Sequence, residues 1–282
     1  MGASGVFLHI FQAFKIGIIS VFYSYYRWVL IGSGFLMYLW AAAHQYLQKL
    51  AFGSETYKNA YRSVDIFFRI LKPVSLYIIF SVGMIALTLI IIQTIVIVFD
   101  HGFEKSSLKN NWPSWNSMVS YVGRGLIVSL IILLSVFFLV MGLLGVIFPL
   151  VDFFRGMLVT GSQPFLPPGW LVNFLHLFLF AMVFVPFGFC FWALIDQHAT
   201  IGQSVKQSYD LSLSHKSFLF LFYLISLGIM VLIHALPYGG IFSYSLYFPV
   251  ALAAQGYLYR HYVAQNFSGF AQKVPYTRPP IL

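Results

Sequence analysis

The sequence predicts an all-helical membrane protein, a polytopic transmembrane bundle of about six membrane segments with amphipathic helices at the membrane surface. Only 8% of the 282 residues are charged and the mean hydropathy is +0.85, whereas soluble domains carry about 25% charged residues. Long apolar runs give the second indication, because a helix needs about 20 apolar residues to cross the hydrocarbon core. The main runs are Leu76–Phe99, Leu126–Leu150, Leu171–Ile195, Phe218–Leu236 and Ile241–Tyr259.

The N-terminal region adds another apolar segment and an aromatic belt. Gly5–Tyr26 has apolar side chains at helical spacing, interrupted by Lys15, and we expect it to lie in the interface or to insert obliquely. The tyrosines that precede Arg27 and Trp28 are typical of the headgroup level. Trp28–Leu47 is the next apolar segment, and its Gly-Ser-Gly sequence favours close contact with another helix.

Two segments, Ser54–Lys72 and Thr200–Leu213, are expected to form amphipathic helices along the membrane surface. Each has apolar side chains at helical spacing and too many polar groups to cross the bilayer. In the second segment this apolar stripe consists of Ile201, Val205, Tyr209 and Leu213. Pro73 is expected to open the span that follows the first segment. The candidate contacts to anionic lipid headgroups are Lys58, Arg62, Arg69, Lys72 and Lys206.

The last two apolar runs predict a hairpin around Pro237–Gly240, because proline fixes φ and glycine reaches positive φ. Small residues on the second helix of this hairpin would allow close packing. The candidate helix-packing residues are Ala251, Ala254 and Gly256. Residues 1–265 are thus expected to form a single helical membrane domain, and residues 266–282 a proline-containing C-terminal tail.

The C-terminal half resembles a known family. Val185-Pro186-Phe187 precedes an apolar stretch, a polar helix with Ser204-Val205-Lys206-Gln207-Ser208-Tyr209-Asp210-Leu211 follows, and Leu258-Tyr259-Arg260-His261-Tyr262 ends the last apolar run. Tyr61–Arg69 adds an amphipathic helix before the first long span. This layout resembles the YciC-like family of bacterial inner-membrane proteins, and the membrane domain fused to some glycerophosphodiester phosphodiesterases. The resemblance implies a location and a fold rather than a reaction.

Titratable residues give no sign of catalysis. The eight histidines lack HxxxH and HExxH spacing, and the seven acids are dispersed along the chain. We therefore expect no enzyme activity, no cofactor and no metal site, with a proton relay between His176 and His234 as the alternative. The single cysteine, Cys190, excludes a disulfide framework within the chain. Sixteen scattered basic residues fit anionic headgroups rather than nucleic acid.

The function expected from these patterns is that of a non-catalytic, multi-pass protein of the bacterial inner membrane. It would act in envelope organisation or as a partner of a larger membrane complex, contacting the bilayer and other membrane proteins or itself. The alternative is a small-molecule or lipid permease, with a midplane site where Pro149, Pro186 and Pro249 break helices. A permease requires a polar cavity that reaches the midplane, whereas a scaffold requires a filled core and an apolar lateral surface.

Two signals for orientation conflict. Basic residues in Lys49–Lys72 and in the C-terminal tail both favour the cytoplasmic side. An odd number of crossings between Lys72 and Thr200 would place the two amphipathic helices on opposite sides. Either Leu126–Thr160 contains an additional re-entrant element near Gly142–Pro149, or one of the two signals is misleading.

Overall fold

A computed structural model of the protein describes residues 3–51, 63–101, 113–158, 178, 181–182 and 184–266. Every regular element in these ranges is helical, as the sequence predicts. The elements are α1 (Ala3–Phe22), α2 (Arg27–Ala51), α3 (Ser63–His101), α5 (Trp115–Leu158), α7 (Cys190–Asp196), α8 (Ile201–Ser214), α9 (Lys216–His234), α10 (Gly239–Phe242), the π-helix η1 (Ser243–Tyr247) and α11 (Phe248–Asn266).

Three segments of the described chain are long and apolar enough to cross a membrane, namely Ile78–Asp100, Trp115–Ser135 and Lys216–His234. Helices α1 and α2 meet at an angle of 100° and add a fourth span if the bent pair crosses as one unit. The protein is therefore a helical membrane protein with three or four candidate spans in its described part. The expected total of about six is not confirmed.

The last apolar run, Ile241–Tyr259, is not among these spans. It forms α10, η1 and part of α11, and the wide turn of η1 immediately precedes Pro249, which has no N–H to donate. Gln255 on α11 is buried within the protein rather than exposed to lipid. This apolar run contributes residues to the hydrophobic core of the described structure, and Gln255 donates hydrogen bonds there to the carbonyl of Gly188 and to Tyr223.

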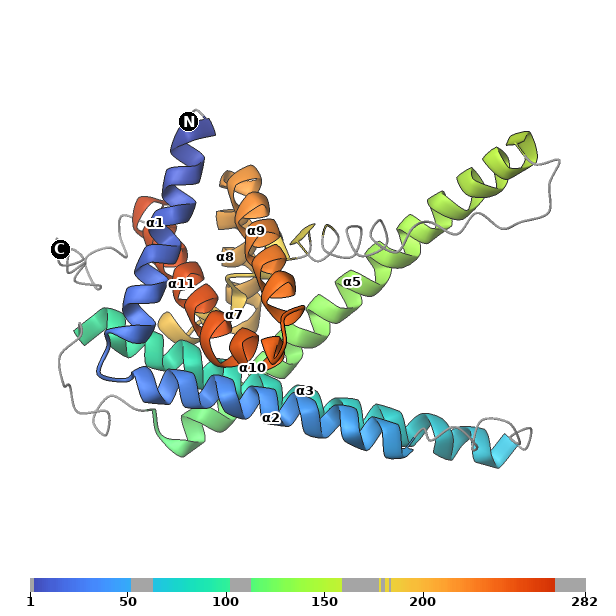
Figure 1. The fold of residues 1–282 in the computed structure, drawn as a ribbon, viewed down its shortest axis with the longest axis horizontal. Helices are drawn as coiled ribbons and strands as arrows, with labels where there is room; N and C mark the ends of the chain where they lie inside the picture. Colours follow the sequence, from blue (N-terminus) through green and yellow to red (C-terminus); the bar gives the residue numbers. More distant parts are fainter. Residues whose placement is uncertain are drawn as a thin grey trace.

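The helices pack in two directions (Figure 1). Helices α2 and α3 lie side by side along the lower edge of the view, and α1 packs along α11 across them. Helix α9 stands beside this second pair, and α5 leaves the body diagonally. Buried polar side chains occur on several of these helices, among them Ser204, Ser208 and Ser212 of α8 and Gln255 of α11.

Helix α3 differs from the expectation for the first amphipathic segment. It begins at Ser63 and continues through Pro73 to His101 as one helix of 39 residues. The expectation that Pro73 separates a surface helix from the span is therefore wrong for the described part of the segment. A proline interrupts the hydrogen bonds of one turn, and the surrounding helix-forming residues continue the helix across it.

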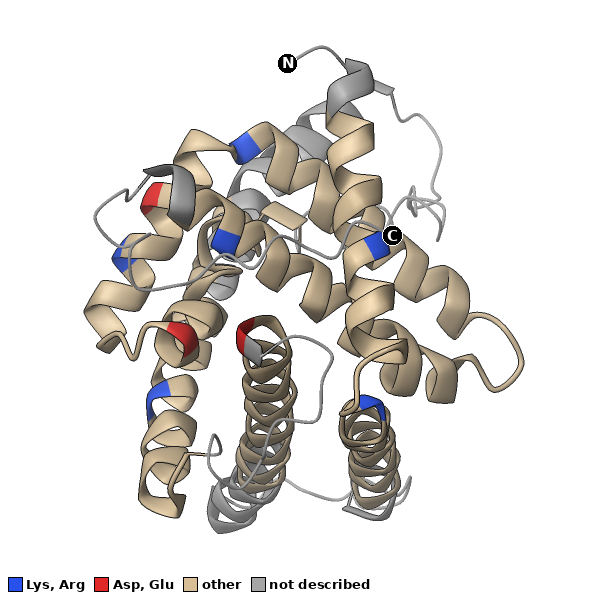
Figure 2. Cartoon of the chain, turned by 90° about the vertical axis from the view of Figure 1, so that its left-hand side faces the viewer, with Lys and Arg blue, Asp and Glu red and all other residues tan. Residues whose placement is uncertain are grey.

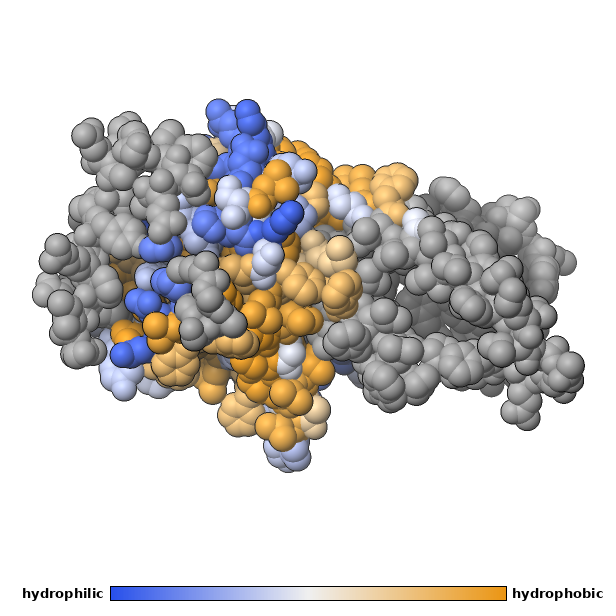
Figure 3. Space-filling view, turned by 90° about the horizontal axis from the view of Figure 1, so that it is seen from above, coloured by the Kyte–Doolittle hydropathy of each residue, from blue (hydrophilic) through white to orange (hydrophobic). Residues whose placement is uncertain are grey.

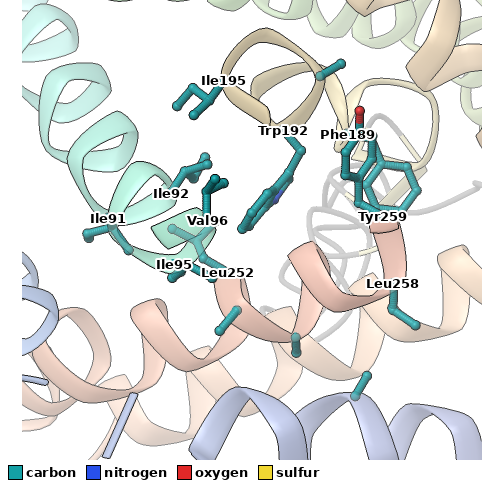
Figure 4. Packing of buried hydrophobic residues seen from close by; sticks show 14 of the residues in the cluster. Ile91, Ile92, Ile95, Val96, Phe189, Trp192, Ile195, Leu252, Leu258 and Tyr259 are labelled. Atoms are coloured by element: carbon teal, nitrogen blue, oxygen red, sulfur yellow. The ribbon is translucent and has the colours of Figure 1, made fainter. Parts of the chain in front are cut away.

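Trp192 of α7 lies at the centre of the hydrophobic core, between α3 and α11 (Figure 4). Its indole is fully buried and faces isoleucine and valine side chains of α3. Gly256 of α11 lies against the indole ring so closely that a Cβ at this position would overlap it. The glycine thus allows α11 to approach the largest side chain of the core.

Polar and apolar surfaces are segregated along the molecule. Viewed from above, hydrophilic residues of the described chain gather toward the left-hand end, and hydrophobic residues occupy the middle (Figure 3). Viewed from that end, acidic and basic residues are visible around the near ends of several helices (Figure 2). This distribution is the one expected where helix ends meet the headgroup region.

Candidate functional site: a closed helix break and an ion-pair cluster

The apolar helix Phe184–Asp196 is broken at Gly188 and Phe189, two residues after Pro186. In a continuous helix the carbonyl of Val185 would accept a hydrogen bond from the N–H of Phe189. The break diverts that N–H to Ser208 Oγ, at 3.1 Å, and the carbonyls of Val185 and Pro186 need other donors. We call the broken segment, together with the side chains of other helices that bind it, the polar junction.

Serines of α8 supply these donors. Ser208 Oγ donates to the carbonyl oxygen of Pro186 at 2.8 Å, and Ser212 Oγ donates to that of Val185. From α11, Gln255 Nε2 donates to the carbonyl oxygen of Gly188 at 2.6 Å. The backbone groups released by the break are thus satisfied by side chains, which is how an interrupted helix is tolerated in an apolar environment.

The apolar stripe of α8 is divided, because Ile201 and Val205 are partly buried against the cluster of Val128, Cys190 and Leu194, whereas the other two stripe residues are exposed. Ser204, Ser208 and Ser212 lie four residues apart and are buried, whereas the exposed fractions of Tyr209 and Leu213 are 49% and 52%. Helix α8 therefore presents a serine face to the protein and a partly apolar face outward. The sequence shows the serine periodicity as clearly as the apolar one, but its meaning depends on the helix break that it serves.

The start of α8 is fixed by a capping box. The side chain of Thr200 accepts a hydrogen bond from the N–H of Gln203, and the side chain of Gln203 accepts one from the N–H of Thr200. The preceding loop is held to α5, because Tyr121 Oη lies 2.6 Å from Nδ1 of His198. Helix α8 is thus anchored before its serine face reaches the polar junction.

Arg260 of α11 forms an ion-pair cluster with two carboxylates at helix ends. Its guanidinium makes a bidentate pair with Asp196, with Nη2–Oδ1 and Nε–Oδ2 distances of 2.6 and 3.1 Å. Nη1 lies 2.8 Å from Oδ1 of Asp100, and the guanidinium also covers the ring of Phe99. The side chains of Arg260 and Asp196 are 10% and 8% exposed, whereas that of Asp100 is 39% exposed.

The cluster joins the C-terminal ends of α3 and α7 to α11. A carboxylate at a helix C-terminus is opposed by the helix dipole, and the guanidinium between the two ends compensates both. Burial disfavours the charge of Arg260, but the neighbouring Asp196 and Asp100 outweigh that effect and raise its pKa. Arg260 therefore acts as a permanently charged connector between three helices.

Of the five candidate headgroup contacts, the structure describes the side chain of Lys206 alone. Lys206 is exposed on α8. Arg69 and Lys72 belong to the first turns of α3, with side chains outside the described residues, and Lys58 and Arg62 lie wholly outside them.

The small residues of α11 face α1 and α7. Ala254 is fully buried, and a Cβ at Gly17 of α1 would lie 3.3 Å from its Cβ. Gly256 faces Trp192, and Ala251 is half-buried. From the sequence, these residues are expected to form the contact between the two helices of the hairpin. In the structure they face other helices. The π-helix makes that contact instead, through side chains that bond to the backbone of α9.

The three prolines of the alternative function have different surroundings. Helix α5 continues through Pro149, and α11 contains Pro249 in its first turn. Only Pro186 lies beside a break within an apolar helix of the described chain. Of the two relay histidines, His176 lies outside the described residues and His234 is exposed at the end of α9.

Comparisons with known proteins give no family assignment, since no protein-family model, no curated protein and no solved structure matches this chain.

Proposed function

We propose that this chain is a non-catalytic protein of the bacterial inner membrane that organises the envelope or joins a larger membrane complex. The observation that carries the proposal is the closed polar junction. Its backbone carbonyls are occupied by Ser208, Ser212 and Gln255, which belong to the protein itself. A permease that used the break at Pro186 as a binding site would need these groups for its substrate.

The outer surface supports the same function. Large aromatic and aliphatic side chains are exposed on the bent pair α1–α2, where they are available to lipid or to another membrane protein. The most exposed are Tyr23, Trp28, Phe11, Leu8 and Tyr46. The resemblance to YciC-like proteins supports the inner membrane as the location, and the exposed Lys206 is a suitable contact for anionic headgroups.

Cysteine accessibility separates the scaffold from the permease. In a Cys190→Ser background, Ser208→Cys and Ser212→Cys should react with a membrane-impermeant thiol reagent at least about tenfold more slowly than Lys206→Cys, because buried positions react only through local opening. The reaction should be measured in native membranes by mass-tag gel shift. Equal labelling of all three positions, with protection of the two serine positions by a solute, would establish the permease instead.

Photocrosslinking tests the partner role. A benzophenone amino acid at Trp28 or Leu36, both exposed on α2, should give discrete protein adducts in native membranes. The same amino acid at Phe222, which is 1% exposed, should give none between chains. Co-expression of two tagged forms of different mass distinguishes a second copy of this chain from another protein. Adducts to lipid alone would contradict the proposal.

A further inference from the structure

A cavity of about 420 Å³ lies where α1, the α8–α9 junction and α11 meet, outside the polar junction. Side chains from all three parts of the chain line it, and four of the described lining residues carry basic groups. These are His9 of α1, His215 and Lys216 at the junction, and His261 of α11. The sequence gives no hint of this convergence, because the four residues lie in three segments far apart along the chain.

Aromatic contacts hold the imidazoles in place around the cavity. The ring of His215 stacks on Tyr262 with centroids 3.9 Å apart. The centroid of the His261 ring lies 6.4 Å from that of His9 and 6.1 Å from that of Tyr257. The imidazoles thus lie on separate elements, with tyrosine rings beside them.

The electrostatic balance of the cavity is one-sided. None of its described lining residues is Asp or Glu. On the surrounding elements, Asp100 and Asp196 are paired with Arg260, and Asp210 is exposed on α8. Among the described residues that line the cavity, those with titratable charge are therefore bases.

We propose that this cavity binds a phosphate group. An ammonium and converging imidazoles form charge-assisted hydrogen bonds with phosphate oxygens. The volume lies in the range of ordinary small-molecule sites and leaves room for a substituent on the phosphate. Phe218 and Leu258 supply apolar wall for such a substituent.

The phosphate has two chemical sources, the headgroup of an anionic lipid and a phosphate ion from the aqueous phase. The site is independent of the proposed partner function and uses none of the candidate headgroup residues named from the sequence. Its test is therefore separate from the tests of the scaffold.

Two arms of one stability measurement distinguish these sources. The full-length protein in a neutral detergent should be melted with sodium phosphate and with sodium chloride at equal ionic strength. It should also be melted in nanodiscs of phosphatidylcholine with and without phosphatidic acid. Stabilisation by inorganic phosphate establishes a site for the free ion, and stabilisation by phosphatidic acid alone establishes a lipid site. No stabilisation in either arm would overturn the proposal.

Two variants test whether the anion binds at this cavity. Lys216→Gln should weaken binding by at least about tenfold, since one charge-assisted hydrogen bond is lost. Its side chain is exposed, and the variant should fold normally. His234→Gln, at the opposite end of α9, is the matched control and should bind like the original chain. Unchanged affinity in Lys216→Gln would overturn the proposal, as would equal losses in both variants.

The pH dependence tests the imidazoles. Burial, and then the neighbouring His261, lowers the pKa of His215, while burial, and then His9, lowers that of His261. A bound anion stabilises the charged imidazoles and raises both pKa values, so affinity should rise as the pH falls from 7.5 to 5.5. Sulfate is the suitable probe because its own charge is constant in this range. A flat profile would overturn the proposal.

The lowered pKa values of His215 and His261 also predict how the stability of the anion-free protein changes with pH. Because the folded-state pKa values are lowered, the unfolded chain binds more protons than the folded chain once the pH falls below about 6.5. The Tm without anion should therefore decrease as the pH falls through this value, and sulfate should reverse part of the decrease. A combined His215→Gln and His261→Gln variant should lose both effects, whereas His234→Gln should retain them.

Discussion

Replacing Arg260 with methionine should destabilise the protein by about 3–5 kcal/mol, because the change leaves a buried carboxylate without its counter-charge. Unpaired Asp196 should account for most of this loss, since its side chain is 8% exposed and both of its oxygens accept hydrogen bonds from the guanidinium. Asp100 is more exposed and should contribute less, because water screens it. The loss should be measured as the change in free energy of unfolding in detergent with denaturant.

A second substitution separates the charge from the packing. Adding Asp196→Asn to Arg260→Met removes the unpaired carboxylate and should recover part of the stability. Arg260→Lys should lie between the two, because an ammonium cannot make the bidentate pair. Lys206→Met, which removes an exposed base from α8, is the control and should change the stability by less than about 0.5 kcal/mol. A stable Arg260→Met variant would show that the cluster does not hold the three helices together.

The sequence contains a trace of this cluster. Asp100, Asp196 and Arg260 each follow directly after one of the long apolar runs. Hydropathy therefore predicts all three near an interface, and the structure places Asp100 and Asp196 at helix ends and Arg260 within α11. It does not show which ends meet, because that depends on the crossing of α3, α7 and α11 around Trp192. Contacts between distant segments have no periodic signature within any one of them.

Helix α8 shows a different limit of prediction from the sequence. Its helical character and its start at Thr200 follow from local rules, namely the apolar spacing and the capping box. The burial of its serine face does not, because that depends on what the rest of the fold places opposite the helix. The partner here is an interrupted backbone near Pro186 with free carbonyls, for which serine hydroxyls are the better match. Sequence reasoning fails where one irregular element changes what its neighbour must supply.

Replacing Ala254 with phenylalanine should lower the stability by about 1–3 kcal/mol or more, since it adds a ring to a fully packed contact. The facing surface is the backbone of α1 at Gly17, where an added Cβ would lie 2.5 Å from the carbonyl oxygen of Val250 and 3.1 Å from the backbone nitrogen of Ala254. Backbone atoms cannot rotate away as a flexible side chain can, so α1 must shift along α11 to admit the ring.

The matched control is Leu232→Phe on α9, where the side chain is 70% exposed and an added ring meets lipid or detergent. Its free energy of unfolding should change by less than about 0.5 kcal/mol. Both variants add aromatic volume to an apolar helix, so a large difference between their Tm values isolates close helix packing from hydrophobicity. Lipid provides no hydrophobic penalty for separated helices, and the approach permitted by small residues must therefore supply the association energy. Equal tolerance at both positions would mean that α1 and α11 are held together by other contacts, and that the close approach at Gly17 is incidental.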